Sequence, residues 1–445
     1  MANEKAPLEA WVAEKIGAAG AAFSREALDR YQLAKLRTTI DWAIRKSPFY
    51  RKLLAGFSGR DLVCLTDLGR LPFTTADDLR RQGLQFICVT QDEISRVVTL
   101  DSSGTTGPAK RLYFTPADQQ ATIDFFRQGM AALAGADDRV LILLPGQRPG
   151  SVGDLLATAL GRLGAEAIAH GPVRSLPATL AIMDCEAVSV VVGAPTQVLA
   201  LARWADAMGK PLRLKSVLLS TDHVPQAISR ELSRLWGCGV FEHYGMTELG
   251  LGGGTECAAH AGYHLHEADF YFEIVDPQTG QPLPAGQAGE VVATTLTRWG
   301  MPLIRYRTGD LSRLVDEPCA CGSVLRRLER ITGRVDGRVT LAGGLSFTLA
   351  DLDESLFAVD KVIDFTARVD SSRLATKLVI DALMASSPVA GSERSLLAAL
   401  DAVPALRQAR RAGTLTVTVA AAGSGDALVA GPAKRAIREL NAADG

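Results

Sequence analysis

Between about residues 96 and 245, short apolar runs alternate with segments of helical spacing, and this alternation constrains the fold most. Strands separated by helices form βαβ units, whose strands are parallel. The sequence therefore predicts an α/β fold with a mostly parallel sheet. The predicted strands are Val140–Leu144, Ala165–Ala169, Ala187–Val192 and Ser216–Ser220, and the predicted helices are Asp154–Leu163, Leu176–Met183, Thr196–Met208 and Gln226–Leu235.

The regions on either side have other patterns. Residues 8–55 and 71–83 are expected to be helical, the second helix entered through a threonine cap. After about residue 250, turn sequences separate the predicted strands Phe270–Val275, Gly289–Thr297 and Leu303–Tyr306, which indicates a β-rich subdomain.

Past Gly333 the pattern indicates a compact α+β domain. We therefore expect an N-terminal domain over 1–333, with its β-rich subdomain at about 250–333, and a small C-terminal domain over 334–445. Within the small domain we expect strands at 338–342, 361–369, 377–381 and 414–419 and helices at 349–357, 391–401 and 433–440.

The composition indicates a soluble globular protein. Of the 445 residues, 47% are apolar and 22% charged, and the net charge is −1. This charge argues against nucleic acid or a polybasic membrane surface as partners. No apolar run approaches the ~20 residues that span a bilayer. The N-terminal stretch does not look like a signal peptide, so we expect a cytoplasmic protein. Seven scattered cysteines do not suggest a disulfide framework.

A dense run of small residues follows the apolar stretch 97–100, and Lys110 comes shortly after it. Glycines let the main chain approach a phosphate, and such a turn exposes backbone N–H groups and hydroxyls. The spacing is not that of a Walker A loop, so we expect another kind of phosphate cradle. The alternative is a polar hairpin. The residues of the run are Ser102, Ser103, Gly104, Thr105, Thr106 and Gly107.

A second polar group follows the predicted sheet. The stretch Tyr244–Glu248, which reads YGMTE, supplies an aromatic ring, a hydroxyl and a carboxylate on one loop. An aromatic ring can stack on a nucleobase, and Thr with Glu can hold Mg²⁺. Further along, Asp310 follows a predicted strand and could accept both hydroxyls of a ribose. The stretch Gly333–Gly337 lies at the expected domain boundary.

Taken in this order, these motifs resemble the adenylate-forming superfamily of acyl-CoA synthetases, luciferases and adenylation domains. More narrowly, the chain is similar to the phenylacetate–CoA ligase family over nearly its whole length. The stretches that carry the resemblance read SSGTTGPAKR, YGMTELG, FEIVDPQTGQPLPAGQAGEVVATTLTRWGMPLIRYRTGDL and ITGRVD. The longest of these stretches is very specific to the family.

The resemblance implies ATP, Mg²⁺ and CoA as cofactors and a small carboxylic acid, aromatic or otherwise apolar, as substrate. It implies that Ser102–Gly107 and Lys110 wrap the ATP phosphates and that Thr106 and Glu248 position Mg²⁺. Asp336 would be the hinge of a mobile C-terminal domain. The remaining residues implied to border the nucleotide are Ser220, Thr221, Asp222, Tyr244, Gly245, Met246, Thr247, Asp310 and Arg334.

One departure concerns the lysine that this superfamily carries near its C-terminus. Aligned on Gly431, its position is Pro432; aligned on the following basic segment, it is Lys434, which we take as the candidate catalytic lysine. The alternative for Lys434 is a solvated cation. Two other functions stay open: adenylation of a hydroxyl acceptor without a thioester, as in relatives acting on a deazaflavin, and a nucleotide sensor that has lost catalysis. A homodimer is also compatible with the sequence.

A candidate structural zinc site combines a CxC turn with an upstream cysteine and histidine. Three thiolates and an imidazole are a typical structural zinc set. Members of the resembled family look similar here, which favours Cys257, His264, Cys319 and Cys321. The alternative is reduced buried thiols and surface histidines.

Overall fold

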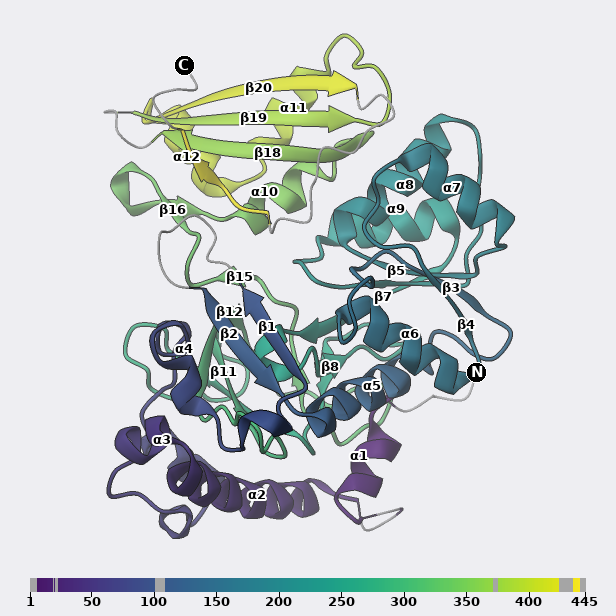
Figure 1. The fold of residues 1–445 in the computed structure, drawn as a ribbon. Coiled ribbons are helices and arrows are strands. Elements are labelled where there is room, and N and C mark those ends of the chain that lie inside the picture. The colour runs from purple at the N-terminus through teal and green to yellow at the C-terminus, as the bar shows by residue number, and fades with distance from the viewer. Residues whose placement is uncertain are drawn as a thin grey trace. The chain divides into compact units, whose positions relative to one another are not determined.

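The computed structural model describes residues 6–18, 20, 23–100, 109–370, 375–423 and 435–440. The chain forms two compact units, each made of segments distant in sequence (Figure 1). The first unit contains residues 1–132, 148–163 and 242–331, and the second contains residues 133–147, 164–241 and 332–445. The predicted α/β class is confirmed, whereas the predicted division at residue 333 stays a prediction.

Capping side chains begin most helices of the first unit. Ser24 accepts a hydrogen bond from Ala27 N at the start of α2, and Thr75 caps α4, as the sequence predicted. Thr115 and Asp118 form a capping box at the start of α5. The helices are α1 (Glu9–Lys15), α2 (Arg25–Lys46), α3 (Pro48–Leu53), α4 (Ala76–Gln82), α5 (Pro116–Met130) and α6 (Val152–Leu163).

The strands of the first unit are mostly antiparallel. A hairpin pairs β1 (Arg96–Leu100) with β2 (Lys110–Phe114), and its register sets Lys110 opposite Leu100. A second group has the order β10-β11-β12 and a third the order β7-β8-β9-β14-β13. The bounds are β7 (Gly239–Gly245), which begins in the second unit, β8 (Gly253–Thr255), β9 (Tyr263–Leu265), β10 (Phe270–Val275), β11 (Gly289–Thr295), β12 (Tyr306–Ser312), β13 (Leu314–Val315) and β14 (Arg327–Leu328).

The predicted strand Leu303–Tyr306 is wrong. Leu303 and Ile304 are buried core residues, but Arg305 has a φ of 48°, which breaks an extended backbone. The strand β12 begins only at Tyr306 and continues through the polar residues that follow.

The second unit contains the predicted parallel sheet, with strands in the order β4-β3-β5-β6. Helices α7, α8 and α9 lie together on one face of these strands (Figure 1). The sequence predicted each of these elements. Their bounds are β3 (Arg139–Ile142), β4 (Glu166–Ala169), β5 (Val190–Gly193), β6 (Ser216–Leu219), α7 (Leu176–Cys185), α8 (Pro195–Ala207) and α9 (Gln226–Trp236).

The C-terminal part of this unit is an α+β segment whose sheet has the order β20-β19-β18-β21. The predicted helix 433–440 is wrong within the described residues, because Arg438–Glu439 forms β21, which pairs with β18. The helix α12 was not predicted. The elements are β15 (Gly333–Arg334), β16 (Val339–Thr340), β17 (Ser346–Phe347), α10 (Leu349–Leu356), β18 (Val362–Asp370), β19 (Thr376–Met384), α11 (Ser392–Leu400), α12 (Pro404–Arg411), β20 (Leu415–Gly423) and β21. Among the described helices, none has the length and apolarity to cross a membrane.

Candidate functional site

Lys110 and Glu248, 138 residues apart in sequence, form a largely buried ion pair in the first unit. Lys110 is the first residue of β2, and Glu248 lies on the short turn Thr247–Leu249 that follows β7. Their side chains are 13% and 6% exposed. Because the pair is shielded from water, each charge depends on its partner for neutralisation.

Two further residues fix the turn that carries Glu248. The Tyr306 hydroxyl donates to Glu248 Oε1 at 3.0 Å, and Arg298 donates to the Glu248 carbonyl. Burial alone would raise the pKa of Glu248, but the Lys110 ammonium and the Tyr306 hydroxyl outweigh burial and lower this pKa below its usual value. The carboxylate is therefore ionised at neutral pH, the form that binds a cation.

Tyr244 and Asp310 are also brought together. The Tyr244 hydroxyl donates to Asp310 Oδ2 at 3.2 Å, which joins β7 to β12. The Tyr244 ring is 5% exposed and packs near Tyr263 and Phe272. Its stacking on adenine and the contact of Asp310 with ribose stay predictions.

Between Tyr244 and Glu248 the chain makes a tight turn. Gly245 ends β7, and a Cβ at this position would lie 2.5 Å from the Leu251 carbonyl oxygen. Met246 packs against the neighbouring cores, and Thr247 begins the turn that carries Glu248. The turn therefore requires glycine at position 245.

The second unit carries the other predicted nucleotide residues. Ser220, Thr221 and Asp222 directly follow β6, at the carboxyl end of a parallel strand, where ligands of α/β sheets usually bind. Thr221 has a φ of 77°, in the left-handed region. Arg334 belongs to β15, and Asp336 lies between β15 and β16. The predicted phosphate loop Ser102–Gly107, with Thr106, and the candidate Lys434 lie outside the described residues.

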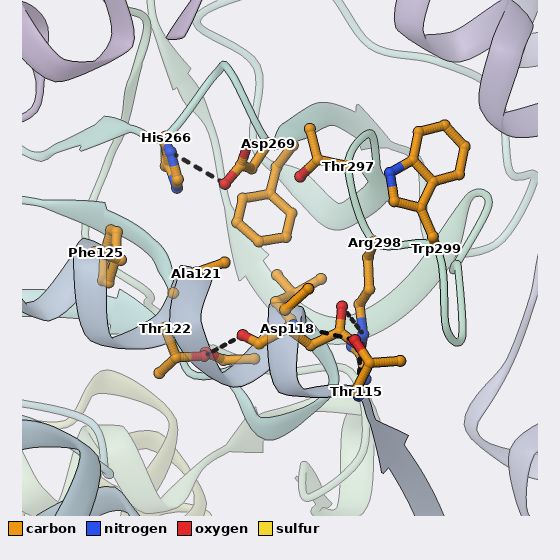
Figure 2. Close-up of a pocket in the computed structure, with 15 residues that line it drawn as sticks. Thr115, Asp118, Ala121, Thr122, Phe125, His266, Asp269, Thr297, Arg298 and Trp299 are labelled. Atoms are coloured by element: carbon orange, nitrogen blue, oxygen red, sulfur yellow. Dashed lines mark hydrogen bonds and ion pairs between the residues drawn. The ribbon is translucent and has the colours of Figure 1, made fainter. Parts of the chain in front are cut away.

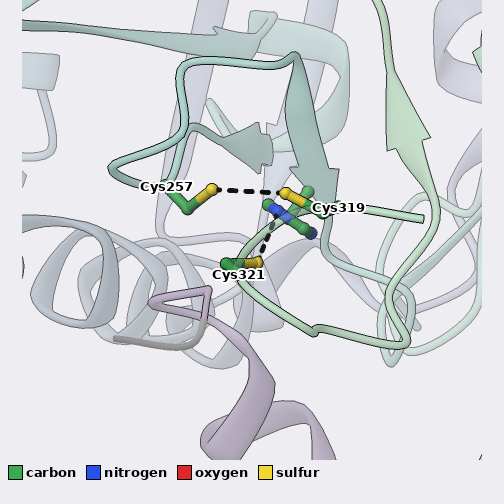
Figure 3. A group of neighbouring side chains, drawn as sticks. Cys257, Cys319 and Cys321 are labelled. Atoms are coloured by element: carbon green, nitrogen blue, oxygen red, sulfur yellow. Dashed lines mark hydrogen bonds between the residues drawn. The ribbon is translucent and has the colours of Figure 1, made fainter. Parts of the chain in front are cut away.

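The four candidate metal ligands converge in the first unit. One ligand atom from each of Cys257, His264, Cys319 and Cys321 lies within 4.8 Å of all the others, and all four residues are buried. Figure 3 shows the three sulfur atoms directed toward one point. The sulfur atoms of Cys257 and Cys319 are 3.6 Å apart, and Cys321 Sγ lies 3.4 Å from His264 Nε2.

These separations fit a tetrahedral zinc ion better than they fit a disulfide. A disulfide needs an S–S distance of about 2.05 Å. Tetrahedral ligands with bonds of about 2.3 Å to sulfur and 2.0–2.1 Å to nitrogen lie about 3.5–3.8 Å apart. Burial lowers the pKa of His264 to about 4, so the imidazole is neutral, as a metal ligand must be. Burial also raises the pKa of Cys257 to about 12, so a thiolate there needs a nearby cation.

Comparison with known proteins decides the family. The family model of AMP-binding enzymes matches residues 90–296. The phenylacetate-coenzyme A ligase of Thermus thermophilus is 30% identical over 76% of this chain and 77% of its own length, and that of Pseudomonas putida is 31% identical over 72% and 73%. The chain belongs to the phenylacetate-coenzyme A ligase family.

A solved structure extends the likeness to the fold of most of the chain. The 2-hydroxyisobutyryl-CoA ligase, crystallised in the postadenylation state, superposes with a TM-score of 0.76 at 22% identity, covering 94% of this chain and 90% of that one. This phenylacetate-coenzyme A ligase homologue therefore has the fold of that ligase.

In this family member, sequence reasoning missed two residues of the site, Tyr306 and Arg298. Both lie in the long stretch that carried the family resemblance, which was the only signal for them. A cavity of about 90 Å³ lies beside Arg298 and the loop after Glu248. Figure 2 shows Asp118 and Thr115 next to Arg298 at one end of this cavity and His266 with Asp269 at the other.

Proposed function

We propose that the chain is an ATP-dependent ligase that activates a carboxylic acid as acyl-AMP and transfers the acyl group to CoA. The largely buried Lys110–Glu248 pair, whose carboxylate lies on the turn of the YGMTE motif in a member of this family, is the observation that supports it best. We further propose an aromatic or otherwise apolar acid, because the curated relatives are named for phenylacetate. A cytoplasmic location and a homodimer stay predictions.

The first half-reaction joins acid and nucleotide. A carboxylate oxygen of the acid attacks the α-phosphorus of ATP, and the bond from that phosphorus to pyrophosphate breaks. Lys110 can neutralise charge on the leaving pyrophosphate, since such transfers need positioning and charge stabilisation more than acid–base chemistry. Glu248, with Thr106, would hold Mg²⁺, which supplies positive charge to the phosphates when bound.

In the second half-reaction, the thiol sulfur of CoA attacks the acyl carbon, and AMP leaves. Asp310 would hold the ribose, with Arg334 near the nucleotide and Asp336 as the hinge between the two half-reactions. Acyl-adenylates hydrolyse readily, so a closing domain that excludes water is useful here.

The test is pyrophosphate release from ATP with a panel of aryl and short-chain acids. We expect release with at least one apolar acid, followed by AMP release that requires CoA. If ATP binds but no acid gives pyrophosphate, the proposal fails. Acid-dependent pyrophosphate without CoA-dependent AMP would favour the other acceptor.

Lys434 is our proposal for the catalytic lysine. Lys434→Ala is expected to slow pyrophosphate release while leaving CoA transfer from preformed acyl-AMP little changed. The control is Lys377→Ala, an exposed lysine on β19. If the rate of adenylation is unchanged in Lys434→Ala, another group must be the catalytic cation of the first half-reaction.

We also propose that Cys257, His264, Cys319 and Cys321 hold a structural zinc ion. Four protein ligands leave no open coordination position, so the ion would stabilise the fold without entering the reaction. Purified protein should contain about one zinc per chain by elemental analysis, and Cys319→Ser should lose it, whereas Cys185→Ser, at an exposed cysteine, should not. Native protein free of zinc contradicts this proposal.

A further inference from the structure

Arg298 is a buried arginine whose guanidinium bonds to main-chain oxygens. It lies on the loop after β11 and is 8% exposed. Its Nη1 donates to the Glu248 carbonyl, and its Nη2 donates to the Tyr113 carbonyl at 3.3 Å. The guanidinium also lies over the Phe114 ring, 4.4 Å from its centre.

The two carbonyls belong to the backbone segments that carry the ion pair. Tyr113 is on β2, three residues after Lys110 on the same strand, and the other carbonyl belongs to Glu248 itself. One side chain therefore bridges the main chain of Glu248 and the strand that begins at Lys110. Arg298 Nε also lies 4.0 Å from Asp118 Oδ1, and the Thr115 main-chain N–H and hydroxyl hold that carboxylate at 2.8 and 2.9 Å.

We propose that Arg298 is a positioning residue that fixes the separation of Lys110 and Glu248, and through it the binding of Mg²⁺ and the ATP phosphates. This inference rests on the proposed function. The planar fork of arginine can donate to two carbonyls at once, whereas a lysine ammonium is a point charge on a flexible stem. A residue that orients a metal-binding carboxylate commonly affects metal affinity or activity by about 10–100-fold when it is replaced.

The adjoining cavity makes a sharper test possible. Arg298 lines this space of about 90 Å³, which together with the volume of a deleted side chain leaves room for a guanidinium ion. Added guanidinium can then donate to the same carbonyls that the side chain had bonded.

The experiment compares wild type with Arg298→Lys, Arg298→Met and Arg298→Ala in the pyrophosphate assay. We expect the Mg²⁺ concentration for half-maximal rate and the KM for ATP to rise about 10-fold or more in Arg298→Met, and less in Arg298→Lys, while the KM for the acid stays unchanged. Guanidinium chloride below denaturing concentrations should partly restore Arg298→Ala, relative to sodium chloride at equal ionic strength.

The control is Arg37→Met, an arginine of α2 that donates to the Leu62 carbonyl at 2.9 and 2.7 Å. It should lower stability without changing the Mg²⁺ requirement. A fall in kcat alone for Arg298→Met, with wild-type Mg²⁺ dependence, would overturn the inference, because a purely structural role predicts that result.

Two measurements separate this inference from the proposed function. Wild type that gives no pyrophosphate contradicts the proposed function, and MgATP binding by calorimetry then tests Arg298 directly. Unchanged MgATP binding in a folded Arg298→Met, or a crystal structure of that variant with the Lys110–Glu248 contact intact, overturns the inference whatever the activity.

Discussion

At the scale of single residues, the Lys110–Glu248 pair illustrates how burial makes two charges interdependent. Both side chains are shielded, and the carboxylate also accepts from Tyr306. Removing one partner of a buried pair leaves an uncompensated charge, whereas removing both charges relieves this penalty. The pair is therefore expected to couple strongly in a double-mutant cycle.

We predict that Lys110→Met and Glu248→Gln each lower the free energy of unfolding by about 3 kcal/mol. The double variant should lose less than the sum, with a coupling of about 1–3 kcal/mol, because neither change then leaves a lone charge. Urea denaturation measures all three. The exposed pair Arg81–Asp77, at 2.9 Å within α4, is the control and should couple by less than about 1 kcal/mol. Additive effects at Lys110 and Glu248 would contradict the prediction.

At the scale of elements, a neutral histidine stabilises the turn after β7 through a hydrogen bond. Burial lowers the pKa of His243 to about 4, so the neutral ring donates through Nε2 to the Leu251 carbonyl at 2.9 Å. Leu251 has a φ of 65°, uncommon for a residue with a side chain, and its N–H donates to the Met246 carbonyl. The turn that carries Glu248 is thus fixed at both ends.

Gly245→Ala is predicted to disturb this turn, since the new Cβ would lie 2.5 Å from the Leu251 oxygen and 2.7 Å from His243 Nε2. We expect a loss of about 1–3 kcal/mol of stability and lower pyrophosphate release. Gly161→Ala is the matched control: it lies within α6 with nothing in contact distance of a new Cβ. That change should stabilise the protein by about 0.5–1 kcal/mol. Thermal denaturation measures the melting temperatures of both variants. Equal melting temperatures for Gly245→Ala and Gly161→Ala would contradict the prediction.

Elements with strong local signals were predictable, and those set by distant contacts were not. The strand β5 is a continuous buried valine run, and α4 begins at a threonine capping box, so both could be read from sequence. The strand β12 alternates buried and half-buried residues. Its sequence YRTGDLS is too polar to predict a strand, whereas the apolar residues just before it do predict one. The helix α12, PALRQARR, buries only Leu406 and Ala409, too little for a helical period to be seen.

The same limit applies to the candidate site. The motif YGMTE located Glu248 because its residue types suggested metal and nucleotide chemistry. Arg298 could not be assigned in this way, since its role depends on which carbonyls the fold brings beside it. Sequence can identify reactive side chains, but the groups that position them depend on tertiary packing.

At the scale of the whole molecule, a buried charge cluster holds together segments of the second unit that are distant in sequence. Arg435 bonds to Asp353 at 2.5 Å, its Nε lies 3.5 Å from Asp364, and its guanidinium lies 4.5 Å from the centre of the Phe365 ring. Asp353 is on α10, Asp364 is on β18, and Asp222, which follows β6, adds a further negative charge. One arginine therefore faces three carboxyl groups.

This imbalance predicts that stability depends on pH. Burial, with repulsion from Asp222 and Asp364, raises the pKa of Asp353 to about 7, although Arg435 opposes the shift. Because the folded protein holds this proton more tightly than the unfolded chain, whose aspartates titrate near 3.9, the contribution is complete below about pH 4 and is lost as the pH rises through about 7. The loss should be on the order of 2–4 kcal/mol.

Asp353→Asn is expected to remove this dependence, because the amide mimics the protonated carboxyl at every pH. The variant should match wild type near pH 4 and exceed its unfolding free energy near pH 8, as measured by urea denaturation across that range. Asp381→Asn, at a half-exposed residue of β19 paired with Arg368 at 2.7 Å, should keep the wild-type slope. If Asp353→Asn is instead less stable than wild type at pH 8, the ionised carboxylate is paired well enough by Arg435, and the three acids do not compete for it.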